Sequence, residues 1–255
     1  MSSTHFKIII PAYNIDRYIE RILLSVFNQD YYNYECIVID DGSTDKTKSL
    51  VEGFVKGNGC KDSFTLYKNE KNLGKGHCLY DAISKLDADD DDVIICLDDA
   101  DWFGGGGVLS ALNEYYKDSD CWLTYGSYIR ASDGVSSRNY NVSEYPKNIR
   151  QSGDFRGEQW RAAQPYTFRY FLARELKRED LLDDDGDFYK MDVFKALMFP
   201  LMEMSREHIR FISDVMCVRN DLLPKKINTL TEQQKTDISM RVLKNHSKRE
   251  RFEVL

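Results

Sequence analysis

Residues 35–45 read ECIVIDDGSTD, an apolar run that ends in two acidic residues and a glycine. The β-branched and apolar residues of this run predict a buried strand over Glu35–Asp40. Thr44-Asp45 supplies residue types that begin helices, so a helix is expected from there through about Phe54. A strand that leads directly into a helix is the unit from which parallel α/β sheets are built.

The same unit recurs along the first half of the chain. Phe6–Pro11 predicts a strand, and apolar residues at helical spacing predict a helix over Asp16–Gln29. Further strands are expected at Phe64–Tyr67 and Asp92–Leu97, with a helix at Gly74–Leu86 between them. The last of these strands is apolar almost throughout, which indicates burial on both faces. The sequence therefore predicts an α/β fold with a mostly parallel central sheet flanked by helices.

The second half of the chain is less regular. Residues 135–160 are polar, aromatic and without a clear period, and a long loop of this kind is usually functional or mobile. The elements expected here are strands at Cys121–Tyr125, Tyr128–Arg130 and Ile209–Ile212, and helices at Thr167–Arg178, Asp192–Glu207 and from about Thr231. No internal repeat or low-complexity linker divides the chain, so one domain over residues 1–255 is expected.

Composition and charge narrow the class of protein. The 255 residues are 42% hydrophobic and carry a net charge of −7, which supports a folded core and argues against a nucleic-acid partner. No apolar run approaches the roughly 18 residues that a membrane-spanning helix needs. The N-terminus lacks a signal-peptide pattern, and the 6 cysteines lie singly, as expected of reduced thiols in a cytoplasmic protein.

The one basic cluster is near the C-terminus and consists of Lys244, Lys248, Arg249 and Arg251. A solvated helix end is the simpler interpretation. The other is contact with an anionic membrane surface or an acidic partner, which would make the protein peripheral to a membrane.

Acidic residues follow the most apolar strand, at Asp98-Asp99-Ala100-Asp101. In parallel α/β sheets, ligands bind at the carboxyl ends of the strands, which is where this cluster falls. Three carboxylates this close repel one another when partly buried, and a divalent cation with oxygen ligands is the usual stabilising partner. The D-x-D spacing suits a Mg²⁺ or Mn²⁺ that bridges a diphosphate. The alternative is an acidic turn with capping carboxylates.

Two other strand ends carry polar groups. In Asp40-Asp41-Gly42-Ser43, a carboxylate can accept the imide N–H of uracil or an amine of another base, or the segment is an ordinary turn. In Asn72–Gly76, glycines before a helix let the backbone approach a phosphate, and Lys75 adds positive charge. Loop glycines of this kind are also common without any ligand.

Together these motifs resemble the family 2 glycosyltransferases of the GT-A fold. The motifs are IIIPAYN at Ile8–Asn14, VIDDGSTD at Val38–Asp45, NLGKG at Asn72–Gly76 and LDDADWF at Leu97–Phe103. The resemblance implies a Rossmann-like GT-A fold with a C-terminal helical extension on the acceptor side. It further implies a nucleotide-sugar-binding half at about 1–108, an acceptor-binding and catalytic half at about 109–230, and a C-terminal helix at about 231–255.

The resemblance also implies which residues bind the donor. The nucleotide-sugar-binding residues are Pro11, Ala12, Tyr13, Asn14, Asp40, Asp41, Lys75, Asp98 and Asp99, and the metal ligands are Asp99 and Asp101. If Trp102 fixes the register, Ala100 stands where the family has a carboxylate. Which two of Asp98, Asp99 and Asp101 bind the Mn²⁺ or Mg²⁺ therefore stays open.

In inverting members of the family, a carboxylate near the start of a helix in the C-terminal half removes the proton from the acceptor hydroxyl. Asp192 matches by position, and Glu203 is the second candidate. Their structural alternatives are a helix cap for Asp192 and a solvent-facing helix residue for Glu203. Weaker candidates for acceptor binding, with core packing as their alternative, are Trp160, Arg161, Tyr166 and Arg169.

The predicted function is an inverting, metal-dependent transfer of a sugar from a nucleotide diphosphate donor to a hydroxyl group, and a UDP-linked sugar is the expected donor. The acceptor would be a glycan, a lipid-linked sugar or a protein, as in polysaccharide biosynthesis. One alternative is a nucleotidyltransferase, which would need a glycine-rich loop after the first strand, where this chain has PAYN. The other is a sugar-nucleotide-binding module whose metal site has decayed, to which Ala100 points.

Overall fold

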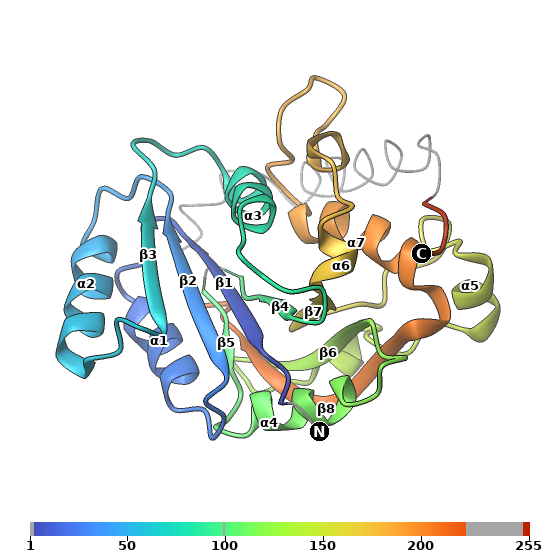
Figure 1. The fold of residues 1–255 in the computed structure, drawn as a ribbon, viewed down its shortest axis with the longest axis horizontal. Coiled ribbons are helices and arrows are strands. Elements are labelled where there is room, and N and C mark those ends of the chain that lie inside the picture. The colour runs from blue at the N-terminus through green and yellow to red at the C-terminus, as the bar shows by residue number, and fades with distance from the viewer. Residues whose placement is uncertain (1–2, 99, 223–251) are drawn as a thin grey trace.

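The fold is organised around one mixed sheet (Figure 1). The computed structural model describes residues 3–98, 100–222 and 252–255, and within them the sheet has 8 strands in the order β3-β2-β1-β4-β7-β6-β8-β5. The strands are β1 (Phe6–Ala12), β2 (Tyr34–Asp40), β3 (Phe64–Lys68), β4 (Val93–Cys96), β5 (Trp102–Phe103), β6 (Leu123–Arg130), β7 (Tyr166–Arg169) and β8 (Ile209–Arg219). The helices are α1 (Ile19–Phe27), α2 (Thr47–Asn58), α3 (Lys75–Ser84), α4 (Val108–Tyr116), α5 (Lys147–Ser152), α6 (Tyr170–Ala173) and α7 (Val193–Ser205), with 3₁₀ turns η1 (Ser137–Tyr140), η2 (Arg178–Leu181) and η3 (Arg206–His208).

Strands β3, β2, β1 and β4 pair in parallel, which confirms the predicted α/β fold with a mostly parallel sheet. Every residue of β1 is buried, as expected for a strand covered on both faces. Ala12 at the end of β1 pairs with Asp40 at the end of β2. Because parallel strands end on the same side, the segments that follow β1, β2 and β4 meet at one edge of the sheet.

Side chains on the two faces of the sheet form two cores. Ile8 and Ile10 of β1 pack with α1, α2 and α4, whereas Ile9 packs with α3 and α7. This alternation follows from the period of two along a strand. Helix α7 is buried over most of its length, so its first turn is fixed relative to the sheet edge.

The helix expected at Thr167–Arg178 is wrong over its first residues, and within that range the α-helix is limited to α6, Tyr170–Ala173. Tyr166–Arg169 instead forms β7, which lies between β4 and β6 and pairs antiparallel with both. All of its residues are buried, and the Thr167 hydroxyl hydrogen-bonds the hydroxyls of Thr124 at 2.6 Å and Tyr116 at 2.7 Å. The apolar spacing suggests a helix, but backbone groups of β4 and β6 need partners inside the core, and β7 provides them.

Other elements also depart from the expected pattern. The strands expected at Cys121–Tyr125 and Tyr128–Arg130 are one strand, β6, and the strand expected at Ile209–Ile212 continues through the whole of β8. Register shifts between β6 and β8 let β8 continue past Ser213 and Asp214, the polar residues that end its apolar pattern. Strand β5 and helix α4 were not predicted.

The basic C-terminal cluster and the membrane prediction are not tested by the fold. None of the helices in the part of the chain that the structure describes is long and apolar enough to cross a membrane. The helix expected from about Thr231 lies outside the described residues, as do Lys244, Lys248, Arg249 and Arg251. Membrane contact therefore stays a prediction.

Candidate active site

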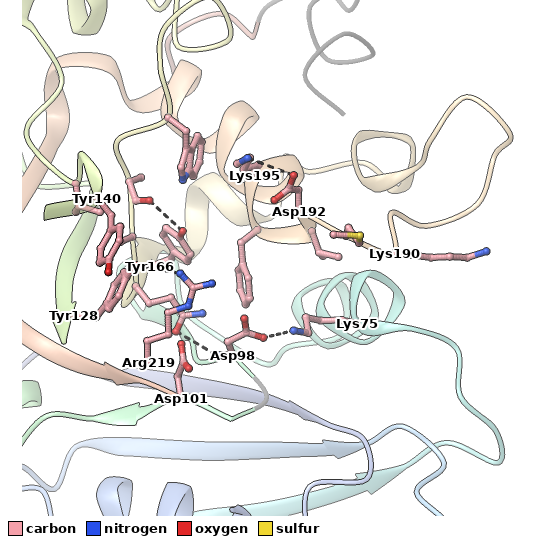
Figure 2. Close-up of a pocket in the computed structure, with 18 residues that line it drawn as sticks. Lys75, Asp98, Asp101, Tyr128, Tyr140, Tyr166, Lys190, Asp192, Lys195 and Arg219 are labelled. Carbon is pink, nitrogen blue, oxygen red and sulfur yellow. Dashed lines mark hydrogen bonds and ion pairs between the residues drawn. The ribbon is translucent and has the colours of Figure 1, made fainter. Parts of the chain in front are cut away.

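The turn after β4 lines one wall of a cavity. The Asp101 N–H donates to the Asp98 carbonyl at 3.1 Å, and β5 then pairs with the end of β8. The side chains of Asp98 and Asp101 both line a cavity of about 440 Å³ (Figure 2). Ala100 is buried and does not line the cavity, and Asp99 lies outside the described residues.

Positive charges accompany the two carboxylates of this turn. The Nζ of Lys75, the first residue of α3, forms an ion pair with Asp98. Burial, followed by the negative charge of Asp98, raises the pKa of Asp101 to about 7. The Asn220 N–H donates to Oδ1 of Asp101 at 2.9 Å. This hydrogen bond and the positive charges of Arg219 and Lys75 offset part of the rise in the pKa of Asp101.

Asp192 lies across the same cavity from these carboxylates (Figure 2). It precedes α7 in the left-handed conformation, with φ 54° and ψ 27°, which Asp adopts more readily than most residues. Asp192 occupies the N-cap position, yet its side chain makes no capping hydrogen bond. Its Oδ2 instead lies 3.3 Å from Nζ of Lys195. A carboxylate in an uncommon backbone conformation that faces a cavity is typical of functional sites.

Glu203, the second candidate base, does not line the cavity. It is 1% exposed, with Oε1 at 2.6 Å from Nε of Arg156 and Oε2 at 2.6 Å from Nη2 of the same arginine. The Phe252 N–H also donates to Oε2, at 3.1 Å. The expected solvent-facing alternative is wrong, because α7 is buried on nearly every side. Glu203 therefore links Arg156 and residue 252 to α7.

Asp41 organises the loop that leads into α3. Its Oδ1 accepts hydrogen bonds from Nδ2 of Asn69 at 2.8 Å and from the Leu73 N–H at 2.9 Å. Its Oδ2 accepts from the Gly74 N–H at 2.8 Å. Because Gly74 directly precedes α3, this network fixes the position of Lys75.

Replacement of Asp41 by Asn keeps the shape of the side chain but turns one of its oxygens into an NH₂ group. We expect Asp41→Asn to lower the free energy of unfolding by about 2–4 kcal/mol, because hydrogen bonds to a charged group contribute about 1.5–3 kcal/mol each. Urea denaturation measures the change, with Asp62→Asn as the control because Asp62 is exposed. Equal stability of the two variants would contradict this account of the loop.

Asp40 is fully buried at the end of β2. Its Oδ1 accepts a hydrogen bond from the Ser43 N–H at 2.9 Å, whereas Oδ2 has no hydrogen-bond partner among the residues that the structure describes. A buried carboxylate oxygen without a partner is unfavourable unless a ligand or water supplies a donor.

The loop after β1 is tied to the segment after β2. The Asn14 N–H donates to Oγ of Ser43 at 3.0 Å, and the Thr44 N–H donates to Oδ1 of Asn14 at 2.9 Å. Pro11 and Ala12 are buried, whereas the side chain of Tyr13 is 37% exposed. Of this motif, Tyr13 is therefore the residue whose side chain is most open to a ligand.

Of the weaker acceptor-binding candidates, Trp160 and Tyr166 line the cavity. Arg161 donates instead to Glu158 at 3.3 Å and does not line it. Arg169 lies at the opposite end of β7, where its guanidinium donates to backbone carbonyls at 2.9 and 3.0 Å. The structure thus brings Trp160 and Tyr166 to the site and gives the two arginines contacts within the fold.

Six charged or polar cavity residues were missed by the sequence analysis: Tyr128, Tyr140, Gln164, Lys190, Lys195 and Arg219. Tyr128 and Arg219 reach the cavity because β6 pairs with β8. No local sequence motif predicts this pairing. Lys195 follows Asp192 by three residues on α7, and this spacing is the one local signal available.

Asp98 and Asp101 fit a divalent cation that completes its coordination with substrate phosphates. Within residues 3–98, 100–222 and 252–255, no cluster of three or more His, Cys, Asp or Glu side chains is arranged to hold a metal. Mg²⁺ at phosphate-binding sites is usually held by one or two carboxylates plus the substrate. Two carboxylates that line one cavity match that donor set.

The sequence matches the model of the family described as glycosyl transferase family 2 over residues 7–180. GlyA, a glycosyltransferase of Streptococcus pneumoniae, is 23% identical over 203 residues, which are 78% of this chain and 26% of that protein. An uncharacterized glycosyltransferase of Haemophilus influenzae is 35% identical over 95 residues, which are 35% of this chain and 38% of that protein. The chain thus spans less than half the length of these curated relatives.

Solved structures share the fold. Staphylococcus aureus TarS 1–349 in complex with UDP-GlcNAc has a TM-score of 0.65 at 17% identity, over 94% of this chain and 65% of that one. The mannosyltransferase PcManGT of Pyrobaculum calidifontis, in complex with GDP-Man and Mn²⁺, has a TM-score of 0.65 at 17% identity, over 99% and 66% of the two chains. At these identities the similarity establishes the GT-A fold.

Proposed function

The chain belongs to glycosyl transferase family 2, and we propose that it moves a sugar from a nucleotide diphosphate to an acceptor hydroxyl with inversion at the anomeric carbon. The observation that carries this proposal is that Asp192 faces Asp98 and Asp101 across one cavity. A base on one wall and diphosphate-binding groups on the other leave the anomeric carbon between them. In-line displacement needs this arrangement.

UDP is the proposed nucleotide of the donor. The buried Oδ2 of Asp40 has no hydrogen-bond partner among the described residues, and the imide N–H of uracil is a donor that would satisfy it. Tyr13 is partly exposed at the same sheet edge, where its ring is available to a base. The TarS structure holds UDP-GlcNAc and the PcManGT structure holds GDP-Man, so the test below includes both nucleotides.

Asp192 is the proposed base. It takes the proton of the acceptor hydroxyl while the hydroxyl oxygen attacks the anomeric carbon and the bond to the diphosphate breaks. Lys195, 3.3 Å away, orients the carboxylate. Lys75, which Asp41 positions through the loop before α3, places a positive charge near the departing diphosphate. Trp160 and Tyr166 form the wall open to the sugar and the acceptor, a glycan, glycolipid or protein.

Asp98 and Asp101 would hold a divalent metal, which supplies positive charge at the departing diphosphate when bound. We expect removal of metal by EDTA to lower turnover roughly 10²-fold and Mn²⁺ or Mg²⁺ to restore it. Asp101→Asn should also raise the Mn²⁺ concentration needed for half-maximal UDP binding in calorimetry, whereas the exposed Asp62→Asn should leave it unchanged. Full turnover in EDTA would refute the metal proposal.

Release of nucleoside diphosphate tests the proposed function. The wild-type protein is incubated with UDP- and GDP-linked sugars, with glycan and lipid-linked acceptors, and with or without Mn²⁺. Turnover of a donor is the expected result. If UDP binds but no donor is consumed, the chain is instead a sugar-nucleotide-binding module, the alternative to which Ala100 points. A lack of UDP and GDP binding would refute both.

A further inference from the structure

Strand β8 brings a guanidinium group to the turn that carries Asp98 and Asp101. Arg219 is the last residue of β8, and its neighbour Val218 pairs with Trp102 of β5. Strand β5 begins directly after Asp101, so this pairing sets Arg219 beside the turn. Figure 2 shows the Arg219 side chain next to Asp98 and Asp101 in the cavity.

Tyr128 holds the guanidinium on its other side. The Arg219 Nη1 donates to the Tyr128 hydroxyl at 3.1 Å, and the guanidinium carbon lies 5.5 Å from the centre of the tyrosine ring. The Asn220 N–H donates to Asp101 at 2.9 Å, which attaches the end of β8 to the same turn. The guanidinium is therefore held in place before any ligand arrives, which is the condition for electrostatic preorganisation.

Lys75 and Arg219, the two positively charged side chains near this turn, have different hydrogen-bond partners. Lys75 forms an ion pair with Asp98, while Arg219 donates to the neutral Tyr128 hydroxyl. A guanidinium presents several N–H donors in a plane, which suits two oxygens of a phosphate group.

We propose that Arg219 is a further catalytic residue that binds the diphosphate of the donor and stabilises its charge as it leaves. The bond from the anomeric carbon to the diphosphate oxygen breaks, its electron pair stays on the diphosphate, and the acceptor proton goes to Asp192. Tyr128 is the positioning residue for the guanidinium. This inference rests on the proposed function, because it assumes a nucleotide diphosphate donor in the cavity.

The test compares ligands with and without the diphosphate. UDP binding is measured by calorimetry and uridine binding by ligand-observed NMR, both in Mg²⁺, which is diamagnetic. We expect Arg219→Ala to weaken UDP binding about 10- to 100-fold, because charge-assisted hydrogen bonds to phosphate are lost, and to leave uridine binding within about twofold. Arg219→Lys should recover part of the loss, because it keeps the charge but not the planar fork. Tyr128→Phe should weaken UDP binding less than Arg219→Ala.

Arg210 on the same strand provides the matched control, because it pairs with Asp118 and Asp120 and does not line the cavity. Arg210→Ala should bind UDP and uridine as wild type does. Thermal unfolding checks that the variants fold. If Arg219→Ala does not fold, UDP and uridine binding by Arg219→Lys and Tyr128→Phe test the role of Arg219.

Three results would overturn the inference. Equal weakening of UDP and uridine would show a merely structural role, and unchanged UDP binding with full turnover would show no role. In both cases the proposed function stands, because wild type still consumes the donor. If wild type binds neither UDP nor GDP, the proposed function fails and the inference about Arg219 fails with it.

Discussion

Replacement of Asp192 by Asn is expected to lower the rate of sugar transfer about 10²- to 10⁴-fold, the range that a positioned general base contributes. The amide has nearly the shape of the carboxylate but cannot accept the acceptor proton. UDP affinity should change little, because Asp192 faces the turn of Asp98 and Asp101, the proposed diphosphate site, from the opposite wall. Transfer rates at saturating donor and calorimetric titration with UDP separate the two effects.

The control variant for Asp192→Asn replaces an aspartate in the acidic loop that precedes Asp192. Asp185 is exposed and does not line the cavity, so Asp185→Asn should transfer at the wild-type rate. The anomeric configuration of the product, read by NMR, should be opposite to that of the donor. An Asp192→Asn variant with wild-type turnover, or a product that retains the donor configuration, would contradict the assignment of Asp192 as an inverting base.

Replacement of Arg156 by Met is expected to lower the free energy of unfolding by about 3–5 kcal/mol, because it leaves the Glu203 carboxylate buried without its counter-charge. The two side chains are 4% and 1% exposed and meet at 2.6 Å through both carboxylate oxygens. A double variant, Arg156→Met with Glu203→Leu, should recover much of the loss, since apolar replacement of a buried pair is often neutral.

Urea denaturation of the single and double variants measures this coupling. Arg174→Met is the matched control, because Arg174 pairs with Asp90 at the surface, where an ion pair contributes about 0–1 kcal/mol. If Arg156→Met is as stable as this control, Glu203 does not act as an internal anchor. Its role as the base would then have to be reconsidered.

The parallel half of the sheet was predictable because each of its units is local. The apolar run before Asp40 and the helix-starting residues after it lie within a dozen positions, and the resulting edge gathers the motifs after β1, β2 and β4. The choice between Asp192 and Glu203 was not local. Both belong to one helical segment, and only the packing of α7 buries Glu203 against Arg156 and leaves Asp192 at the cavity.

Long-range pairing explains what the sequence did not reveal. The sequence predicts a helix over residues 167–178, but residues 166–169 form β7 because β4 and β6 lie on either side of them. Arg219 reaches Asp101 only through β8, whose end is attached to a turn more than a hundred positions earlier in the chain. No motif surrounds Arg219, so its place in the cavity depends entirely on the tertiary fold.

The most direct test of the central claim is a crystal structure of the protein with UDP and Mn²⁺. We expect the diphosphate to lie between Arg219 and the turn of Asp98 and Asp101, with the base at the end of β2 and Asp192 across the cavity. A separate groove of about 550 Å³, lined by residues of β3 and α3 such as Tyr67 and His77, provides the contrast. UDP bound in that groove, with none in the cavity, would contradict the assignment of the active site.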